Sequence, residues 1–308
     1  MKTALLFAGQ GAQVVGMGKY LAAVFPSARG WAEKANAALG YDLAGICFNG
    51  PEAELIRTEN AQPGIFLASW LAFQLLKERV PSLAFAATAG LSLGEFTALA
   101  AAGALSFEDG LRVVRQRGKF MQEACDATQG GMAAIIGLDE AATRQVCAEA
   151  GVALANLNCP GQIVISGEAA KIGRACELAK AKGARRALPL TVAGAYHSPL
   201  MSGAQPKLAQ ELSRVTLKAP TVTVVSNVTA LPHRDANSIR ELLVQQVTSS
   251  VRWEDSIRWL LAQGFTRFIE LGPGTALTGF MKRIDKDAVT LNVADAASLE
   301  ATVNALAA

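Results

Sequence analysis

The sequence has 308 residues, of which 51% are hydrophobic, with a mean hydropathy of +0.26 and a formal net charge of +3. A chain of this length can bury a large core as one domain or two, and its small net charge gives no indication of a nucleic acid partner. Charge or glycine interrupts its apolar stretches within about 18 residues, which is too short for a membrane span.

The cysteines and the first nine residues bear on the cellular location of the protein. The five cysteines are scattered and form no Cys-x-x-Cys pair, which predicts reduced thiols in a cytoplasmic protein. Residues 1–9 resemble a short signal sequence, but they lack an adequate apolar core and run directly into a glycine turn. We interpret them as a buried first strand.

The predicted elements alternate between strands and helices along most of the chain. Buried strands are expected at 3–8, 84–89, 222–226 and 267–271, and helices at 60–78 and 93–102. Strands that alternate with helices predict an α/β fold, in which helices cover both faces of a parallel sheet.

Residues 128–195 follow a different order. Strands are expected at 131–138, 152–156, 162–167 and 184–192, with helices at 140–150 and 169–182. The order β-α-β-β-α-β is the ferredoxin-like pattern, in which two helices lie on one face of a four-stranded antiparallel sheet. We therefore expect a small subdomain at 128–195, inserted into a large domain made of residues 1–127 and 196–308.

A Gly-x-Ser-x-Gly motif at 90–94 stands between a predicted strand and a predicted helix. In such a strand–turn–helix the serine is exposed on a sharp bend beside the first N–H groups of the helix. Ser92 is therefore a candidate nucleophile, although five residues alone also fit an ordinary glycine-rich turn.

A serine hydroxyl needs an adjacent base, and the chain has only two histidines. His233 lies among turn-forming and charged residues, so we expect it at the surface. His197, at the return from the small subdomain, is the candidate base. An α/β-hydrolase usually has its histidine near the C-terminus, after the acid; here 111 residues follow His197, which disfavours a conventional esterase.

The turn Gly-Gln-Gly at 9–11 follows the first predicted strand directly. Glycines at a strand end let backbone N–H groups point at an oxyanion. A nucleotide-binding turn competes with this interpretation, but Gly-x-Gly-x-x-Gly fails at Val14 and no Gly-Lys-Ser/Thr follows.

Arg117 falls at the edge of an apolar stripe on a helix predicted to begin at Ser106. It lies beside Met121, whereas the neighbouring cations project from the polar side. A buried arginine needs an anion, because its desolvation is otherwise costly. That anion can be a protein carboxylate or a substrate carboxylate held by two parallel hydrogen bonds.

A basic patch lies at 171–186, where six cations accompany one acid and give a local charge of +5. It could steer an acidic partner or form an ordinary solvated helix face. Its cations are Lys171, Arg174, Lys180, Lys182, Arg185 and Arg186.

Taken together, six motifs resemble the malonyl-CoA:acyl carrier protein transacylases of fatty acid synthesis, over essentially the whole chain. They are Phe-Ala-Gly-Gln-Gly-Ala-Gln at 7–13, Gly-Leu-Ser-Leu-Gly-Glu at 90–95, Gln-Arg-Gly-Lys-Phe-Met-Gln at 116–122, Asn-Cys-Pro-Gly-Gln at 158–162, Ala-Tyr-His-Ser-Pro-Leu-Met at 195–201 and Glu-Leu-Gly-Pro-Gly at 270–274. Six motifs in family order are specific, although no single one would be.

The resemblance implies an α/β-hydrolase-like large domain with an inserted ferredoxin-like subdomain. It implies Ser92 as nucleophile, His197 as its base, and Arg117 as the clamp of the malonyl carboxylate. It also implies an oxyanion hole made by the backbone N–H groups of Gln10 and Leu93. The backbone carbonyl of Gln246 would orient the histidine, and further substrate contacts would come from Met121, Asn158 and Tyr196.

Two positions depart from the family pattern. Leu91 stands where the family usually has histidine, and Tyr196 where it often has phenylalanine. Leu91 cannot supply a polar contact, so a role that the family's histidine has at this position cannot be assigned to Leu91. Bulky Tyr196 should crowd an α-methyl group on the substrate.

The implied reaction is ping-pong transfer of malonyl from malonyl-CoA to the phosphopantetheine thiol of acyl carrier protein, with no permanently bound cofactor or metal. The basic patch at 171–186 is the candidate docking site for the carrier, and we expect a monomer. A free-standing acyltransferase of a polyketide synthase is an alternative; a serine esterase or thioesterase, or a subunit with a vestigial site, is disfavoured.

Overall fold

The computed structural model describes residues 1–307, which form a five-stranded parallel sheet and a four-stranded antiparallel sheet. The strands are β1 (Thr3–Phe7), β2 (Ala87–Gly90), β3 (Gly130–Ile136), β4 (Ala153–Cys159), β5 (Gln162–Glu168), β6 (Arg186–Pro189), β7 (Thr223–Val225), β8 (Arg267–Leu271) and β9 (Val289–Val293).

The helices of the N-terminal half are α1 (Lys19–Val24), α2 (Pro26–Leu39), α3 (Leu43–Asn49), α4 (Glu52–Leu55), α5 (Thr58–Arg79), α6 (Gly94–Ala101) and α7 (Phe107–Asp126). They are followed by α8 (Glu140–Ala150), α9 (Ala169–Ala181), a 3₁₀ turn at Pro199–Met201, α10 (Ala204–Ser213), α11 (Ala236–Gln246), α12 (Trp253–Ala262), α13 (Ala276–Ile284) and α14 (Ala296–Ala307). Within residues 1–307, none of these helices is both long and apolar enough to cross a bilayer.

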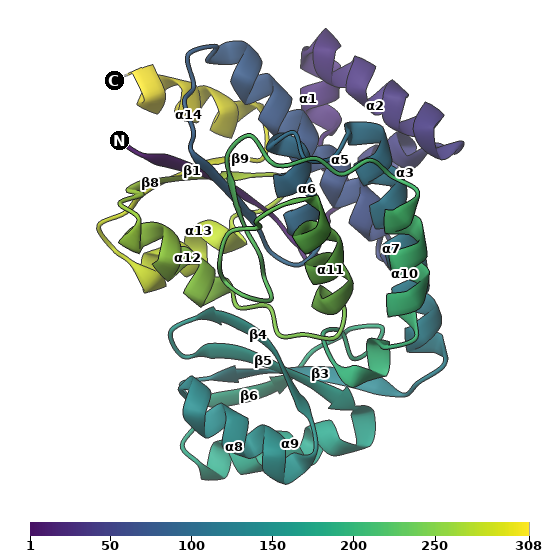
Figure 1. Cartoon of the computed structure of the whole chain (residues 1–308), viewed down its shortest axis with the longest axis vertical. Coiled ribbons are helices and arrows are strands. Elements are labelled where there is room, and N and C mark those ends of the chain that lie inside the picture. Colours follow the sequence, from purple (N-terminus) through teal and green to yellow (C-terminus); the bar gives the residue numbers. More distant parts are fainter. Residues whose placement is uncertain (308) are drawn as a thin grey trace.

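The larger sheet has the order β7-β2-β1-β8-β9, and all of its neighbours pair in parallel. Because side chains alternate along a strand, β1 contributes to two cores. Leu5 and Phe7 join the core that contains α5, α6 and α7, whereas Ala4 and Leu6 face α12 and α13. The predicted parallel sheet with helices on both faces is confirmed (Figure 1).

The smaller sheet has the order β4-β5-β3-β6, with antiparallel neighbours throughout. Its apolar side packs on α8 and α9, which cover the face turned away from the parallel sheet (Figure 1). The last strand is shorter than expected, because only 186–189 pair with β3 and the chain then leaves for the larger sheet.

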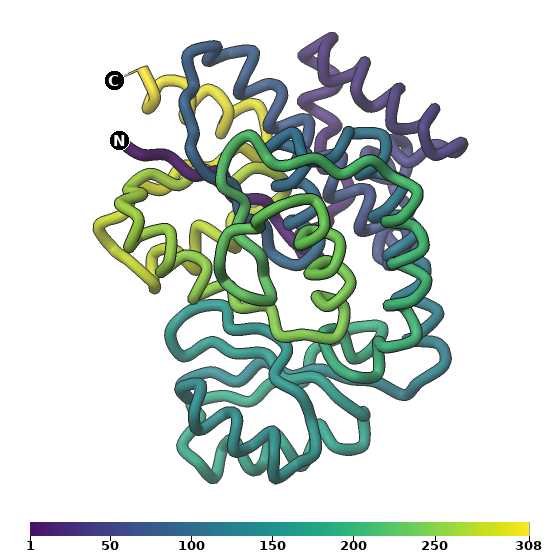
Figure 2. The backbone as a smooth tube through the Cα atoms, viewed as in Figure 1, coloured from purple at the N-terminus to yellow at the C-terminus, as the bar shows by residue number. Residues whose placement is uncertain are grey.

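The backbone trace shows how the chain enters and leaves the smaller sheet (Figure 2). It enters after α7 and leaves after β6 through residues 190–195, which lead to residues 196–197 and the 3₁₀ turn.

Candidate active site

Ser92 lies on the sharp turn between β2 and α6, with a left-handed backbone (φ 53°). Glycines make the turn possible: a Cβ built on Gly90 would lie 1.9 Å from the carbonyl of Gly94, and one on Gly94 would lie 2.3 Å from the carbonyl oxygen of Phe7. The motif glycines therefore let helix and strands approach one another, and the serine holds a backbone conformation that side chains rarely adopt.

His197 reaches Ser92 from the segment that follows the smaller sheet. Its Nε2 lies 2.8 Å from Ser92 Oγ, and its Nδ1 lies 2.9 Å from the carbonyl oxygen of Gln246. A carbonyl oxygen can only accept, so Nδ1 carries the proton and the lone pair of Nε2 faces the serine. Burial, helped by the charge of Arg117, lowers the pKa of His197 to about 4, so the ring is neutral at pH 7.

Arg117 projects from α7 into the same site and is 1% exposed. Its guanidinium donates to Gln62 Oε1 (2.7 Å), Ser92 Oγ (3.1 Å) and Gln246 Oε1 (2.8 Å). Burial lowers the pKa of Arg117 to about 10, which leaves it charged at pH 7. Its Nε has no hydrogen-bond partner in residues 1–307. This buried cation is therefore held by neutral groups and keeps one N–H donor unused.

The turn after β1 packs directly on the serine turn, since a Cβ built on Gly9 would lie 2.4 Å from the carbonyl oxygen of Leu91. Across residues 1–307, the backbone N–H groups of Gln10 and Leu93 donate to no other protein group. The Leu91 side chain itself is partly buried against the core beneath α12 and α13.

Met121 and Tyr196 lie beside this cluster. Gln62 Nε2 contacts Met121 Sδ at 3.6 Å, and the Tyr196 hydroxyl lies 2.8 Å from Thr58 Oγ1 and 3.4 Å from Gln10 Nε2. Burial raises the pKa of Tyr196 to about 12, so the phenol is neutral.

Asn158 is buried near the end of β4, and its Oδ1 has no partner in the part of the chain that the structure describes. No hydrogen bond connects it to Ser92, His197 or Arg117.

The cations at 171–186 lie outside this cluster, on α9, on the first residue of β6 and in the turn between them. Lys171 and Lys182 form exposed ion pairs with Glu168 (2.7 Å) and Glu149 (2.8 Å). The side chains of Arg174, Lys180, Arg185 and Arg186 are exposed.

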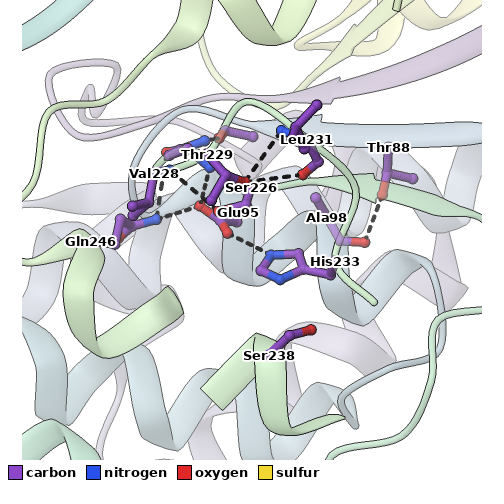
Figure 3. A network of polar contacts seen from close by, with 12 residues as sticks. Thr88, Glu95, Ala98, Ser226, Val228, Thr229, Leu231, His233, Ser238 and Gln246 are labelled. Carbon is purple, nitrogen blue, oxygen red and sulfur yellow. Dashed lines mark hydrogen bonds and ion pairs between the residues drawn. The ribbon is translucent and has the colours of Figure 1, made fainter. Parts of the chain in front are cut away.

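One expectation was wrong. His233 is not at the surface: its side chain is fully buried, with Nε2 2.7 Å from Glu95 Oε1 (Figure 3). The prediction relied on the turn-forming neighbours of His233 and ignored Glu95, an acid within the apolar first turns of α6. A buried carboxylate needs donors, and that requirement is the signal in the sequence that could have revealed the pair.

Asn227 and Gln62 were not anticipated either. Asn227 Oδ1 accepts the backbone N–H of Ser92 (2.6 Å), and its Nδ2 donates to the carbonyl of Gly90 (2.8 Å), so it fastens both sides of the nucleophile turn. Gln62 connects Arg117 to Gln10. Neither residue lies in a sequence pattern that is typical of catalytic or binding residues.

Comparison with known proteins matches the acyl transferase domain family to residues 4–301. The malonyl CoA-acyl carrier protein transacylase of Bacillus subtilis is 46% identical, over 99% of this chain and 97% of its own length. The chain belongs to the malonyl-CoA:acyl carrier protein transacylase family. The Escherichia coli K12 transacylase is 44% identical, over 91% of this chain and 92% of its own length.

Solved structures of the family have the same fold. A transacylase from Clostridium perfringens is 38% identical and covers 100% of this chain and 98% of its own, with a TM-score of 0.95. A malonyl-transacylase in complex with a type II polyketide-synthase acyl-carrier protein is 39% identical and covers 99% and 100%, also with a TM-score of 0.95. The family fold therefore spans both sheets.

Proposed function

We propose that the chain transfers a malonyl group from malonyl-CoA to the phosphopantetheine thiol of an acyl carrier protein, through a malonyl ester on Ser92. One observation carries the proposal: Ser92 Oγ lies within hydrogen-bond distance of both a neutral histidine and a buried arginine. The first is what an acyl-transfer nucleophile needs. The second selects an acyl group that carries its own carboxylate.

In the first half-reaction, the malonyl carboxylate binds Arg117 with two parallel hydrogen bonds. The Ser92 proton passes to His197 Nε2 as Oγ attacks the thioester carbonyl carbon. The C–S bond then breaks, and the proton on Nε2 goes to the sulfur of coenzyme A, which leaves as a thiol.

The second half-reaction runs through the same groups. The phosphopantetheine thiol gives its proton to His197 Nε2, and its sulfur attacks the ester carbonyl carbon. The C–O bond breaks and the proton returns to Ser92 Oγ. Both thiols arrive with the substrates, so we propose that the reaction needs no resident cofactor.

The backbone N–H groups of Gln10 and Leu93 would hold the oxyanion of both tetrahedral intermediates. Their freedom from other hydrogen bonds and the close packing of the two turns support this role. Each donor would lower the barrier by about 3 kcal/mol. Met121, Tyr196 and Asn158 remain candidates for contact with the substrate.

For the carrier, the candidate docking surface is α9 together with β6. Exposed Arg185 and Arg186 and the half-exposed Leu188 line an open hollow of about 530 Å³. A surface that combines cations with apolar side chains fits an acidic partner protein.

We propose residues 128–195 as a subdomain inserted into a large domain of 1–127 and 196–308, acting as a monomer in the cytoplasm. All five cysteines are buried and free, which suits a reducing compartment.

A polyketide pathway remains the second candidate for the destination of the malonyl group. The polyketide biosynthesis protein ThaF of Burkholderia thailandensis is 44% identical over 91% of this chain, a match that spans 24% of that longer protein.

Mass spectrometry tests the proposed reaction. Intact protein mixed with malonyl-CoA should gain one malonyl group on Ser92, and holo acyl carrier protein should then remove it and become malonylated. Ser92→Ala is the matched control and should stay unmodified. Release of free malonate without transfer would instead indicate a hydrolase, and an unmodified wild-type Ser92 would refute the proposal.

A further inference from the structure

Glu95 has a fully buried side chain directly behind the nucleophile turn, in the first turn of α6. Its Oε2 accepts from Gln246 Nε2 (2.7 Å) and from the backbone N–H of Asn227 (3.0 Å), and its Oε1 faces His233 Nε2. The proposed reaction uses neither Glu95 nor His233, yet a buried charge is costly unless it is matched by donors. The proposed reaction therefore does not explain why the Glu95 carboxylate is buried at this cost.

The Glu95 carboxylate fixes which way the Gln246 amide points. Gln246 Nε2 lies near three acceptors, which are Glu95 Oε2, the carbonyl oxygen of Ser92 (2.9 Å) and Asn227 Oδ1 (3.4 Å), so this end of the amide must be the NH₂. Gln246 Oε1 then faces Arg117, which donates to it at 2.8 Å. A reversed amide would place its oxygen against a carboxylate and its NH₂ against a guanidinium.

His233 completes the set of donors around the carboxylate. A proton on His233 Nε2 gives Glu95 Oε1 its donor, and the ring's Nδ1 has no partner in residues 1–307. Without His233, Oε1 would be a buried, unmatched carboxylate oxygen, free to draw the Gln246 or Asn227 donors out of place.

The same residue, Gln246, thus serves two parts of the site. Its side-chain oxygen holds Arg117, and its backbone oxygen holds His197. Figure 3 shows His233, Glu95 and Gln246 in a line, with Glu95 in the middle. The backbone contact is fixed by the end of α11, whereas the amide contact is set by the acceptors around Nε2, of which only the Glu95 carboxylate carries a charge.

We propose that Glu95 and His233 are positioning residues for acyl-group selection: His233 holds Glu95, Glu95 orients the Gln246 amide, and that amide aims Arg117 at the carboxylate of the acyl group. This inference rests on the proposed function. Because the link runs through the Gln246 side chain to Arg117, disturbing it slows the loading of acyl groups that bear a carboxylate more than the loading of those that do not.

The test compares loading of Ser92 from malonyl-CoA and from acetyl-CoA, each as kcat/KM. His233→Leu removes the donor and should lower malonyl loading by about 10- to 100-fold, the effect of losing one or two hydrogen bonds to a charged group. Acetyl loading should change by less than about threefold. His233→Gln, whose amide can donate from a similar position, should restore most of the malonyl preference.

Two further variants separate positioning from general support of the fold. Glu95→Asp keeps the charge but withdraws the carboxylate from Gln246, so it should lower the malonyl-to-acetyl ratio even if His233→Leu does not fold. Thr88→Val, on β2, removes another buried hydrogen bond to the same helix, donated to the carbonyl of Ala98 (3.0 Å), and should leave the ratio unchanged.

Wild-type protein is measured first, because failure of malonyl loading there would refute the proposed function itself. If wild type is loaded and both His233→Leu and Glu95→Asp keep the wild-type ratio, the positioning role alone is wrong. An equal loss with both acyl groups would likewise overturn it, since that is the effect of a purely structural pair.

Discussion

Arg117→Ala is the variant that most directly tests how the site selects its acyl group. The arginine is buried, and its three hydrogen-bond partners are uncharged oxygens of Gln62, Ser92 and Gln246. An incoming carboxylate would therefore be the first anion in direct contact with the guanidinium. The alanine removes that contact and leaves the nucleophile and its base in place.

The expected loss follows from the contacts removed. A buried carboxylate left without its cation costs about 3–4 kcal/mol, which corresponds to a decrease of about 10²- to 10³-fold in kcat/KM for malonyl-CoA. An acetyl group has no carboxylate to lose. Removing Arg117 also frees Ser92 Oγ from one hydrogen bond and removes a charge that lowers the pKa of His197. Acetyl loading should therefore persist or increase.

The assay follows Ser92 acylation from each thioester by stopped reactions and intact mass. Arg112→Ala, an exposed arginine on the same helix, is the matched control and should behave as wild type with both substrates. Equal losses of malonyl and acetyl loading in Arg117→Ala would show that Arg117 supports the site in general, and the clamp would then be refuted.

Three other predictions concern pH, packing and docking. Because burial lowers the pKa of His197 to about 4, Ser92 acylation should stay independent of pH down to about 5 and fall below about 4, as the base becomes protonated; a midpoint near the ordinary value of about 6.5 would contradict this. Gly94→Ala would place a Cβ 2.3 Å from the Phe7 carbonyl oxygen and should lower the free energy of unfolding by about 3 kcal/mol; wild-type stability in a urea titration would show that the turn is not tightly packed. Reversing the charges of Lys180 and Lys182 should raise the KM for the carrier protein and leave that for a small thiol acceptor unchanged, and an equal KM for the carrier would leave this surface as an ordinary solvated face.

The fold could be predicted largely from local pattern. The strand at Arg267–Leu271 and the helix at Glu140–Ala150 have the expected bounds, because their apolar spacing is clear and glycine follows each. The strand expected at 184–192 was too long. Its apolar residues continue past Pro189, but a strand requires a partner, and β3 is paired only as far as Pro189.

In the site, too, some residues could be predicted from the sequence and others could not. Ser92, His197 and Arg117 were predicted from motifs and Gln246 from the family resemblance, and the structure brings all four into contact. His233 was misplaced because its burial depends on Glu95, which lies 138 positions away in the chain. An acid among the apolar residues of α6 indicates that a donor is needed, but only the tertiary fold identifies His233 as that donor.

The smaller sheet is fastened to the rest of the molecule by more than its two chain connections. Leu157 N–H donates to the carbonyl of Val251, Val251 N–H donates to that of Ala155, and Arg283 of α13 donates to the carbonyl of Pro160. Swinging this sheet outward would break these bonds, at about 1 kcal/mol each. It would also pull on Val251, five residues after the carbonyl that holds His197. The two sheets should therefore behave as one rigid body, so that the choice of acyl group rests on fixed shape and charge and a docking carrier meets a base that is already in place.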